Sequence, residues 1–374
     1  MPELADIFFR YGPEYKKRFQ GRILPSHLRA MQDIVDCRTE VLGGHAYLCE
    51  NDTCREQYVY SYHSCKNRHC PKCQNDQAEQ WLRKQRLKLL PVPYFLVGFT
   101  LPAELRNIAR AHQKAVYNAF FQSSADALQK LALDPRFVGG LIGMTGVLHT
   151  WDRTGGYHPH VHYLVPGGGL SLDHSTWLPS RPDFLVRIEP LSIIFKAKFR
   201  QALKKTGLFD QAPAGVWEKE WVTHSKAVGS GKEAAMYLAR YIYRVAFTNA
   251  SLLKMENDTV TFKYKESKTK VVRTMTLPVM TFMHRFLQHV LPKNFIKVRH
   301  YGFHNHKNKH LLAVVRYLLA VPWLPEEKKQ PIPAKKLYCP GCQGELRLVA
   351  NIKARGPPRY DERKKAIFCH GAFN

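Results

Sequence analysis

The sequence is poor in acidic residues and has no long apolar segment. Its 374 residues include 57 Lys and Arg but only 30 Asp and Glu, which gives a formal net charge of +27. No apolar run approaches the roughly 20 residues that a membrane-spanning helix needs. The first residues, MPELADIFFRYG, carry acidic side chains instead of the apolar core of a signal peptide. These features argue against a membrane or exported protein, and we expect a soluble protein of the cytoplasm.

The excess of positive charge favours a polyanionic partner. The basic residues are spread along the chain and no amphipathic tail stands out, so nucleic acid is a better candidate than a membrane surface. The segment GSGKE, residues 229–233, resembles the end of a phosphate-binding loop but lacks the other residues of that motif. Lys232 and Arg240 are instead candidate DNA contacts, as are Arg83 and Lys84 in a basic helical segment.

The nine cysteines are unevenly placed, because six of them lie between Cys37 and Cys73 with histidines among them. In a long chain this crowding indicates metal binding in a reducing compartment rather than disulfides. Cys49 and Cys54 form a C-x4-C knuckle, Cys70 and Cys73 form a C-P-x-C knuckle, and two knuckles can enclose one ion in a tetrahedron of thiolates. We therefore predict one structural zinc at these four cysteines.

Two further groups of Cys and His remain open. One lies in the same turns and would form a second zinc site, or else buried thiols with a capping histidine; it consists of Cys37, His45, Cys65 and His69. The other lies in the tail and fits a further small zinc module; it consists of Cys339, Cys342, Cys369 and His370.

Hydrophobic periodicity predicts an α+β fold. An antiparallel sheet with helices on one side suits the order of the expected elements. We expect helices in residues 1–36 and 76–90, a strand from Tyr94, helices in 105–132, a strand hairpin in 140–165, helices in 191–207 and 232–247, a second hairpin in 259–277, and helices in 279–291 and 310–324.

Three histidines alternate in the segment YHPHVHYLV, which otherwise reads as a buried strand. Period-two spacing places His158, His160 and His162 on one face of a sheet. If the preceding strand turns back at residues 154–155, His149 lies opposite His160. Three converging imidazoles suit a divalent metal that keeps positions open for phosphate oxygens. We expect His149, His160 and His162 to hold this metal, with Asp152 and Glu233 as alternatives for the third ligand; a supporting or DNA-contacting role for His158 is open.

Tyrosines supply a candidate nucleophile. Tyr237 and Tyr241 are four residues apart in YLARYIYRVAF, so a helix would present both hydroxyls on one face, whereas Tyr243 points elsewhere. The same spacing is common in cores and interfaces. A second set alternates in YVYSY between the knuckles, where either stacking on DNA bases or ordinary packing is open; it consists of Tyr58, Tyr60 and Tyr62.

With these motifs, the chain resembles the HUH-type rolling-circle transposases of the insertion sequence ninety-one family. The family's motif of His, a bulky apolar residue and His matches residues 160–162, and its two tyrosines separated by three residues match Tyr237 and Tyr241. The strings SCKNRHCPKCQ and LPKNFIKVRHYG are also similar to family segments, so the resemblance extends to about residue 322. The first knuckle departs from the family, because four residues rather than two separate Cys49 from Cys54.

The resemblance implies an HUH endonuclease-like α+β fold, in which a small zinc-ribbon-type domain precedes a central antiparallel sheet with helices. It divides the chain into a helical, zinc-binding DNA-recognition domain (1–90), a single-strand nuclease domain (91–325), and a linker with a short Cys-containing tail (326–374).

It also implies a mechanism. Mg²⁺ or Mn²⁺ at the histidines polarises the scissile phosphate, and Tyr237 attacks it to form a 5′-phosphotyrosine and a free 3′-OH. Tyr241 then acts in the second cleavage or in strand transfer. The expected substrate is single-stranded DNA or hairpin ends of the element, in the nucleoid of a bacterial-type cell. The oligomeric state is left open.

Three rival functions fit parts of the pattern. A replication initiator or a conjugative relaxase would share the chemistry, although the N-terminal zinc block argues against both. A zinc-dependent DNA-binding protein without catalysis would use the histidines structurally. A metal hydrolase that activates water would form no covalent adduct with DNA.

Overall fold

The computed structural model describes residues 1–54, 58–73, 89–229, 233, 236, 245–266, 269–322 and 337–354. None of the helices in these ranges combines the length and the apolar character that crossing a membrane requires. Several residues singled out from the sequence lie outside the described ranges: Arg83, Lys84, Lys232, Tyr237, Arg240, Tyr241, Tyr243, Cys369 and His370.

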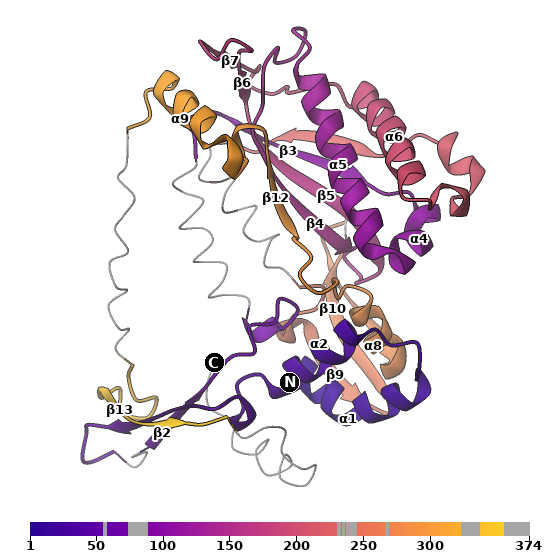
Figure 1. The fold of residues 1–374 in the computed structure, drawn as a ribbon. Helices are drawn as coiled ribbons and strands as arrows, with labels where there is room; N and C mark the ends of the chain where they lie inside the picture. The colour runs from indigo at the N-terminus through magenta and orange to yellow at the C-terminus, as the bar shows by residue number, and fades with distance from the viewer. Residues whose placement is uncertain are drawn as a thin grey trace.

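A five-stranded antiparallel sheet forms the centre of the larger part of the molecule (Figure 1). Its strands, in spatial order, are β12 (Val298–Tyr301), β4 (Met144–Trp151), β5 (Tyr157–Pro166), β3 (Tyr94–Thr100) and β8 (Thr223–Ala227). β4 and β5 form the expected hairpin, and their register places His149 opposite His160, which confirms the predicted pairing.

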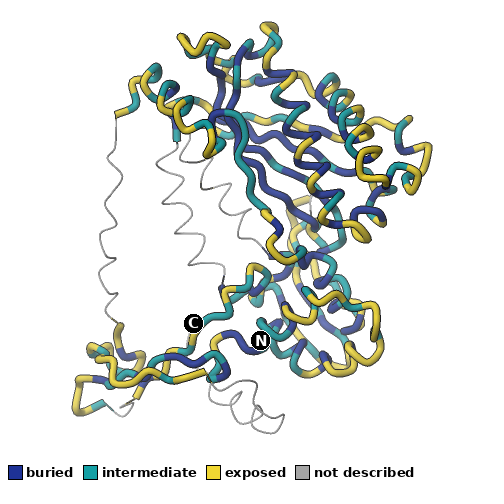
Figure 2. Tube along the Cα trace, in the orientation of Figure 1, coloured by how far each residue is buried: buried dark blue, intermediate teal, exposed yellow. Residues whose placement is uncertain are grey.

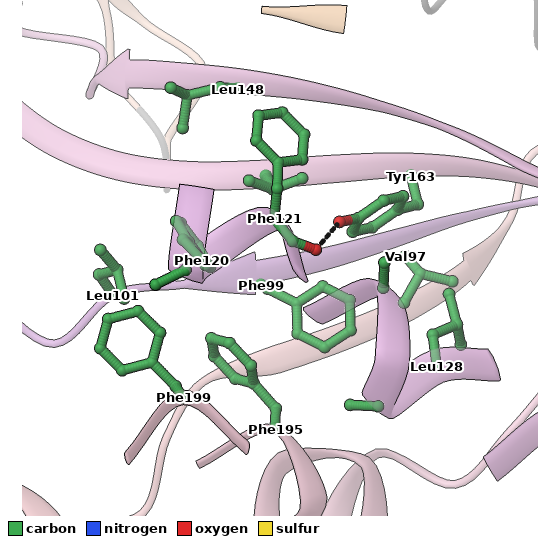
Figure 3. Packing of buried hydrophobic residues seen from close by; sticks show 14 of the residues in the cluster. Val97, Phe99, Leu101, Phe120, Phe121, Leu128, Leu148, Tyr163, Phe195 and Phe199 are labelled. Atoms are coloured by element: carbon green, nitrogen blue, oxygen red, sulfur yellow. Dashed lines mark hydrogen bonds between the residues drawn. The ribbon is translucent and has the colours of Figure 1, made fainter. Parts of the chain in front are cut away.

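Three helices cover one face of this sheet (Figure 1): α4 (Arg106–Ala111), α5 (Gln113–Ala132) and α6 (Ile188–Lys205). Alternate residues of the strands point into the core beneath these helices, as period-two geometry requires. Figure 3 shows Phe99 and Tyr163 of the sheet packed among Phe120, Phe195 and Phe199 of the helices. The Tyr163 hydroxyl stays satisfied in this apolar setting because it donates to the Phe121 carbonyl at 3.1 Å. The predicted α+β class, with an antiparallel sheet and helices on one side, is confirmed.

The opposite face of the sheet carries the histidine strand. Along β5, Val161, Tyr163 and Val165 belong to the helix-covered core, so His160 and His162 point to the other side. Only a small apolar cluster forms there among the described residues, around Tyr94, Val147 and Leu164.

A second core joins the N-terminal helices to a segment far along the chain. α1 (Leu4–Arg18) and α2 (Pro25–Asp36) pack against α8 (Val279–Leu287) and a three-stranded sheet of β9 (Leu252–Glu256), β10 (Thr259–Lys265) and β11 (Val272–Pro278). α1 begins at a capping box of Glu3 and Asp6, and α2 has Pro25 at its first position, where proline's fixed φ suits a helix. The rings of Phe8 and Phe286 meet at 5.3 Å across this core.

A small, separate sheet extends away from the second core (Figure 1). It has the order β13 (Leu346–Ile352), β1 (Gly44–Cys49), β2 (Tyr58–Tyr62), with both pairs antiparallel. Figure 2 shows it as largely exposed or half-buried, in contrast to the central sheet.

Short elements complete the described fold. The hairpin of β6 (Gly168–Leu170) and β7 (Trp177–Pro179) and the helix α9 (Lys309–Leu318) lie at the other end of the molecule (Figure 1). Single 3-10 turns lie at Glu40–Leu42, Pro71–Cys73, Ala103–Leu105, Phe209–Gln211, Ala214–Trp217, Asn249–Ser251, Gly302–His304 and His306–Asn308.

Candidate functional site

Three histidines converge on the face of the central sheet that lies opposite the helices. The candidate ligand atoms of His149, His160 and His162 all lie within 4.8 Å of one another. Their ring centroids are 4.9 to 5.5 Å apart. Strand pairing creates this group, because β4 brings His149 directly beside the two histidines that alternate along β5.

The local hydrogen bonds prepare His160 to act as a ligand. Its Nδ1 lies 2.7 Å from the carbonyl oxygen of His158, so Nδ1 carries the proton and donates it. This leaves the Nε2 lone pair for a metal ion. Burial lowers the pKa of His160 to about 4 and that of His162 to about 3, and both imidazoles are therefore neutral near pH 7.

The two alternative ligands lie elsewhere. Asp152 is exposed, and its carboxylate oxygen Oδ1 accepts hydrogen bonds from the backbone N–H groups of Thr154 and Gly156, which closes the β4–β5 turn. Glu233 is exposed, with its carboxylate beside the backbone of Gly229. Among the described residues, the candidate third ligand that lies beside His160 and His162 is therefore His149, and neither Asp152 nor Glu233 belongs to this group.

A fourth histidine, which the sequence did not reveal, lies beside the group. The register places His162 of β5 and His224 of β8 on either side of Gly98 in β3. A side-chain Cβ at Gly98 would lie 1.9 Å from Cε1 of His224, so only glycine lets this imidazole lie across the strand. The ring of His224 is 5.7 Å from that of His162. His158 lies one step away, where Nη2 of Arg106 donates to its Nδ1 at 2.7 Å.

The cysteines form two groups that differ from the predicted one. In each group the four sulfur atoms lie within 4.8 Å of one another. The first group is Cys37, Cys65, Cys70 and Cys73. The second group is Cys49, Cys54, Cys339 and Cys342.

The predicted joint site of the two knuckles is therefore wrong, for a geometric reason. Cys37 directly follows α2 and Cys65 lies just beyond β2, so both are at the base of the β1–β2 hairpin, near Cys70 and Cys73. Cys49 ends β1 at the far end of that hairpin, about 15–20 Å along the strand from its first residue. In the first group, Sγ of Cys73 is 3.5 Å from Sγ of Cys37 and 3.6 Å from Sγ of Cys65.

Two models of transposase families match parts of this chain. Residues 7–101 match a family model described as "Transposase zinc-binding domain", and residues 143–310 match one described as "Putative transposase". The sequence is 35% identical to the "Putative transposase y4qJ" of Sinorhizobium fredii, over 96% of this chain and 98% of the relative. The chain belongs to the insertion sequence ninety-one family of transposases.

Two further similarities are weaker. This transposase is 27% identical to the transposase for insertion sequence element IS801 of Pseudomonas savastanoi pv. phaseolicola, over 76% of this chain and 72% of the relative. Among solved structures, a bacterial tRNA(His) guanylyltransferase-like protein in complex with GTP covers 57% of the chain and 98% of its own length, at 10% identity and a TM-score of 0.21. That score is too low to bear on the fold.

The histidines proposed for a second zinc site do not join either cysteine group. In the transposase structure His69 is half-buried, and its Nε2 accepts a hydrogen bond from the backbone N–H of Leu291 at 3.2 Å. His45 donates through Nδ1 to Oδ1 of Asn351 at 2.8 Å and packs against the ring of His63. The alternating Cys and His spacing suggested a mixed site, but the chain uses these histidines to join segments that are distant in sequence.

The alternating tyrosines of β2 lie on an exposed face of the transposase. Tyr58 and Tyr60 are 56% and 51% exposed, so they do not pack against a neighbouring helix of the described structure. The rings of Tyr60 and Tyr62 are stacked, with centroids 6.5 Å apart. This face therefore offers aromatic surface to a partner.

Proposed function

We propose that this transposase cleaves and rejoins single-stranded DNA through a 5′-phosphotyrosine intermediate, in rolling-circle transposition. The observation that supports the proposal is the convergence of His149, His160 and His162 on one face of the sheet. A stacked duplex would hinder the joint approach of a tyrosine hydroxyl and a metal site to one phosphate, and this favours a single-stranded substrate.

The chain's own residues would divide the chemistry as follows. His149, His160 and His162 hold a divalent ion, and Mg²⁺ or Mn²⁺ bound there would polarise the scissile phosphate. The Tyr237 hydroxyl loses its proton and attacks the phosphorus, so that a tyrosine–phosphate bond forms while the bond to the 3′ oxygen breaks and leaves a 3′-OH. Tyr241 serves the second cleavage or the strand transfer. Because the phosphotyrosine retains the bond for rejoining, the reaction needs no ATP.

The three parts of the chain would then have distinct tasks. Residues 1–90 recognise the element's DNA end, with a structural zinc at Cys37, Cys65, Cys70 and Cys73. Residues 91–325 carry the nuclease, and residues 326–374 supply a linker and a short Cys-containing tail, whose β13 joins the N-terminal sheet. Zinc fits the first cysteine group because four thiolates at about 2.3 Å from one ion lie about 3.8 Å apart. The sulfur–sulfur distances of 3.5 to 3.6 Å are close to that value.

DNA would bind through charge and stacking together. The net charge of +27 attracts the phosphate backbone, and Tyr58 and Tyr60 offer rings on which unpaired bases can stack. Lys232, Arg240, Arg83 and Lys84 are further candidate contacts. We place this activity on DNA of the bacterial nucleoid, in the cytoplasm.

A cleavage assay tests the proposal. Full-length protein is incubated with 5′-labelled or 3′-labelled single-stranded oligonucleotides that span an element end, with Mn²⁺ or EDTA, and analysed on denaturing gels. We expect a metal-dependent covalent adduct with the 3′-labelled fragment, through its 5′ phosphate, while the 5′-labelled fragment is released with a free 3′-OH. The adduct should vanish in Tyr237→Phe and in His162→Ala, while Tyr243→Phe, a matched control in the same segment, retains it.

The rival functions give different results in the same assay. DNA binding without a cut or adduct under every metal and end tested would favour the non-catalytic binding protein. Metal-dependent cleavage without an adduct would favour a hydrolase that uses water. A replication initiator would produce the same adduct but would act at a replication origin rather than at an element end.

A further inference from the structure

The second cysteine group joins parts of the chain that are almost 300 residues apart. Cys49 lies at the end of β1 and Cys54 in the loop that follows, whereas Cys339 and Cys342 belong to a C-P-x-C knuckle just before β13. The match to the zinc-binding family model ends at residue 101 and therefore includes only the first pair.

The sulfur geometry matches a tetrahedral ion. Sγ of Cys49 is 3.4 Å from Sγ of Cys342, and Sγ of Cys54 is 3.6 Å from Sγ of Cys339. A tetrahedron of thiolates at about 2.3 Å from zinc has edges of about 3.8 Å, so a small expansion accommodates the ion. A disulfide would need a sulfur–sulfur distance near 2.05 Å, which none of these pairs approaches.

The backbone of the C-terminal knuckle is also arranged for thiolates. The N–H of Gly344 donates to Sγ of Cys342 at 3.4 Å, and such a bond stabilises the charged form of sulfur. The turn is closed by hydrogen bonds from Cys339 N to the Gly344 carbonyl and from Gln343 N to the Cys339 carbonyl, each 2.8 Å long. Gln343 adopts a left-handed φ of 60°, which allows the tight turn.

The small sheet has too little apolar core to hold β13 by itself. The buried members of its apolar cluster are only Cys49, Val59 and Cys339, and five of the seven residues of β13 are exposed (Figure 2). A sheet this small needs a further constraint, such as a disulfide or a metal ion, to remain folded.

We infer that Cys49, Cys54, Cys339 and Cys342 bind a second zinc ion, which fastens the C-terminal segment onto the N-terminal hairpin as its third strand. The ion is shared, with one knuckle from each end of the chain. It therefore couples the folding of residues 337–354 to the DNA-recognition domain, and the sheet loses β13 when the ion is removed.

Zinc content measured on the purified full-length protein tests the inference. Mass spectrometry of the metal should give two zinc ions per chain for the wild type, one for each cysteine group. Cys49→Ser with Cys54→Ser should reduce the content to one, and so should Cys339→Ser with Cys342→Ser. The decisive variant replaces all four cysteines and should still contain one zinc, because both pairs serve the same ion.

Other outcomes would overturn the inference. Two zinc ions remaining in Cys339→Ser with Cys342→Ser, or none remaining in the fourfold variant, would show that the two pairs do not share a site. Cys369→Ser is the matched control in the tail and should retain two ions; a loss there would assign the C-terminal knuckle to a different partner.

A second readout detects the strand and does not depend on metal analysis. Hydrogen–deuterium exchange should be slow in the peptides that contain β1 and β13 of the wild type, and fast in β13 after substitution of either cysteine pair. The peptides of α1 and α8 act as an internal folding control and should not change. Unchanged protection of β13 in both double variants would contradict the role of the ion.

Discussion

His289 should make the stability of the transposase depend on pH, because it is buried between the two main parts of the molecule. It is 3% exposed, and its Nε2 donates to the Gly155 carbonyl at 2.9 Å while its Nδ1 lies 3.2 Å from the Thr150 hydroxyl. It thus fixes the turn of the β4–β5 hairpin, whose strands carry the candidate metal ligands, to the segment that follows α8.

The size of the effect follows from the shift in pKa. Burial lowers the pKa of His289 from 6.5 to about 4. Between these values the unfolded chain binds a proton that the folded chain does not, so the free energy of unfolding falls as the pH falls and stays level below pH 4. At about 1.36 kcal/mol per unit, the loss is about 3 kcal/mol in total, of which about 2 kcal/mol occurs between pH 7 and pH 5.

His289→Gln isolates this contribution. The amide can still donate to the Gly155 carbonyl but does not titrate, so the variant is expected to be less stable than the wild type at pH 7 by about 1 kcal/mol. Between pH 7 and pH 5 the wild type loses the stability that the neutral His289 provides, whereas the variant has no such group to titrate. The difference in free energy of unfolding should therefore shift by about 2 kcal/mol in favour of the variant at pH 5.

Urea denaturation at pH 7, 6 and 5 measures the difference, with His310→Gln, an exposed histidine of α9, as the control. A constant difference between the wild type and His289→Gln across this range would refute the assignment.

Three further predictions concern the sites themselves. Gly98→Ala should displace the His224 imidazole and weaken Mn²⁺ binding, measured by calorimetry, by about 10-fold or more. His224→Ala should weaken it by the same factor. The double variant should bind Mn²⁺ no more weakly than either single variant. Additive losses would contradict the steric link. Cys70→Ser should lower the thermal midpoint of unfolding and the zinc content together, because the first cysteine group lies in the core shared by α1, α2 and α8; an unchanged midpoint would show that zinc is dispensable there. Tyr60→Ala should weaken binding of single-stranded DNA by about 1–3 kcal/mol in fluorescence anisotropy, while Tyr60→Phe keeps the ring and the affinity. Equal losses in both variants would argue against stacking.

The sequence was most informative where structure is local. The turn at residues 152–156 and the alternation along β5 together set the hairpin register, and this register alone brings His149 beside His160. Each short cysteine pair likewise stays within one sulfur group, because two to four intervening residues keep the two side chains close together.

Contacts between distant segments were the part that a single sequence could not supply. The spacing of Cys49 and Cys54 defines a knuckle but contains no information about which other knuckle it meets. His224 lies in the polar strand THSKA, and only its pairing through Gly98 makes it a neighbour of His162. The packing of residues 252–287 onto α1 and α2 depends on complementary apolar surfaces, and the apolar pattern of each segment alone does not say which surface it will meet.

The shared sheet of β13, β1 and β2 also determines the order in which this protein can fold on the ribosome. Its two cysteine pairs are separated by 285 to 293 residues. At about 5–20 residues per second, the hairpin of β1 and β2 waits about 15–60 s for its third strand to be synthesised. During this time the backbone N–H and C=O groups on the open edge of β1 are available to any other strand. Newly made chains are therefore exposed to mispairing at the N-terminal hairpin, and premature termination upstream of Cys339 would leave that edge open permanently.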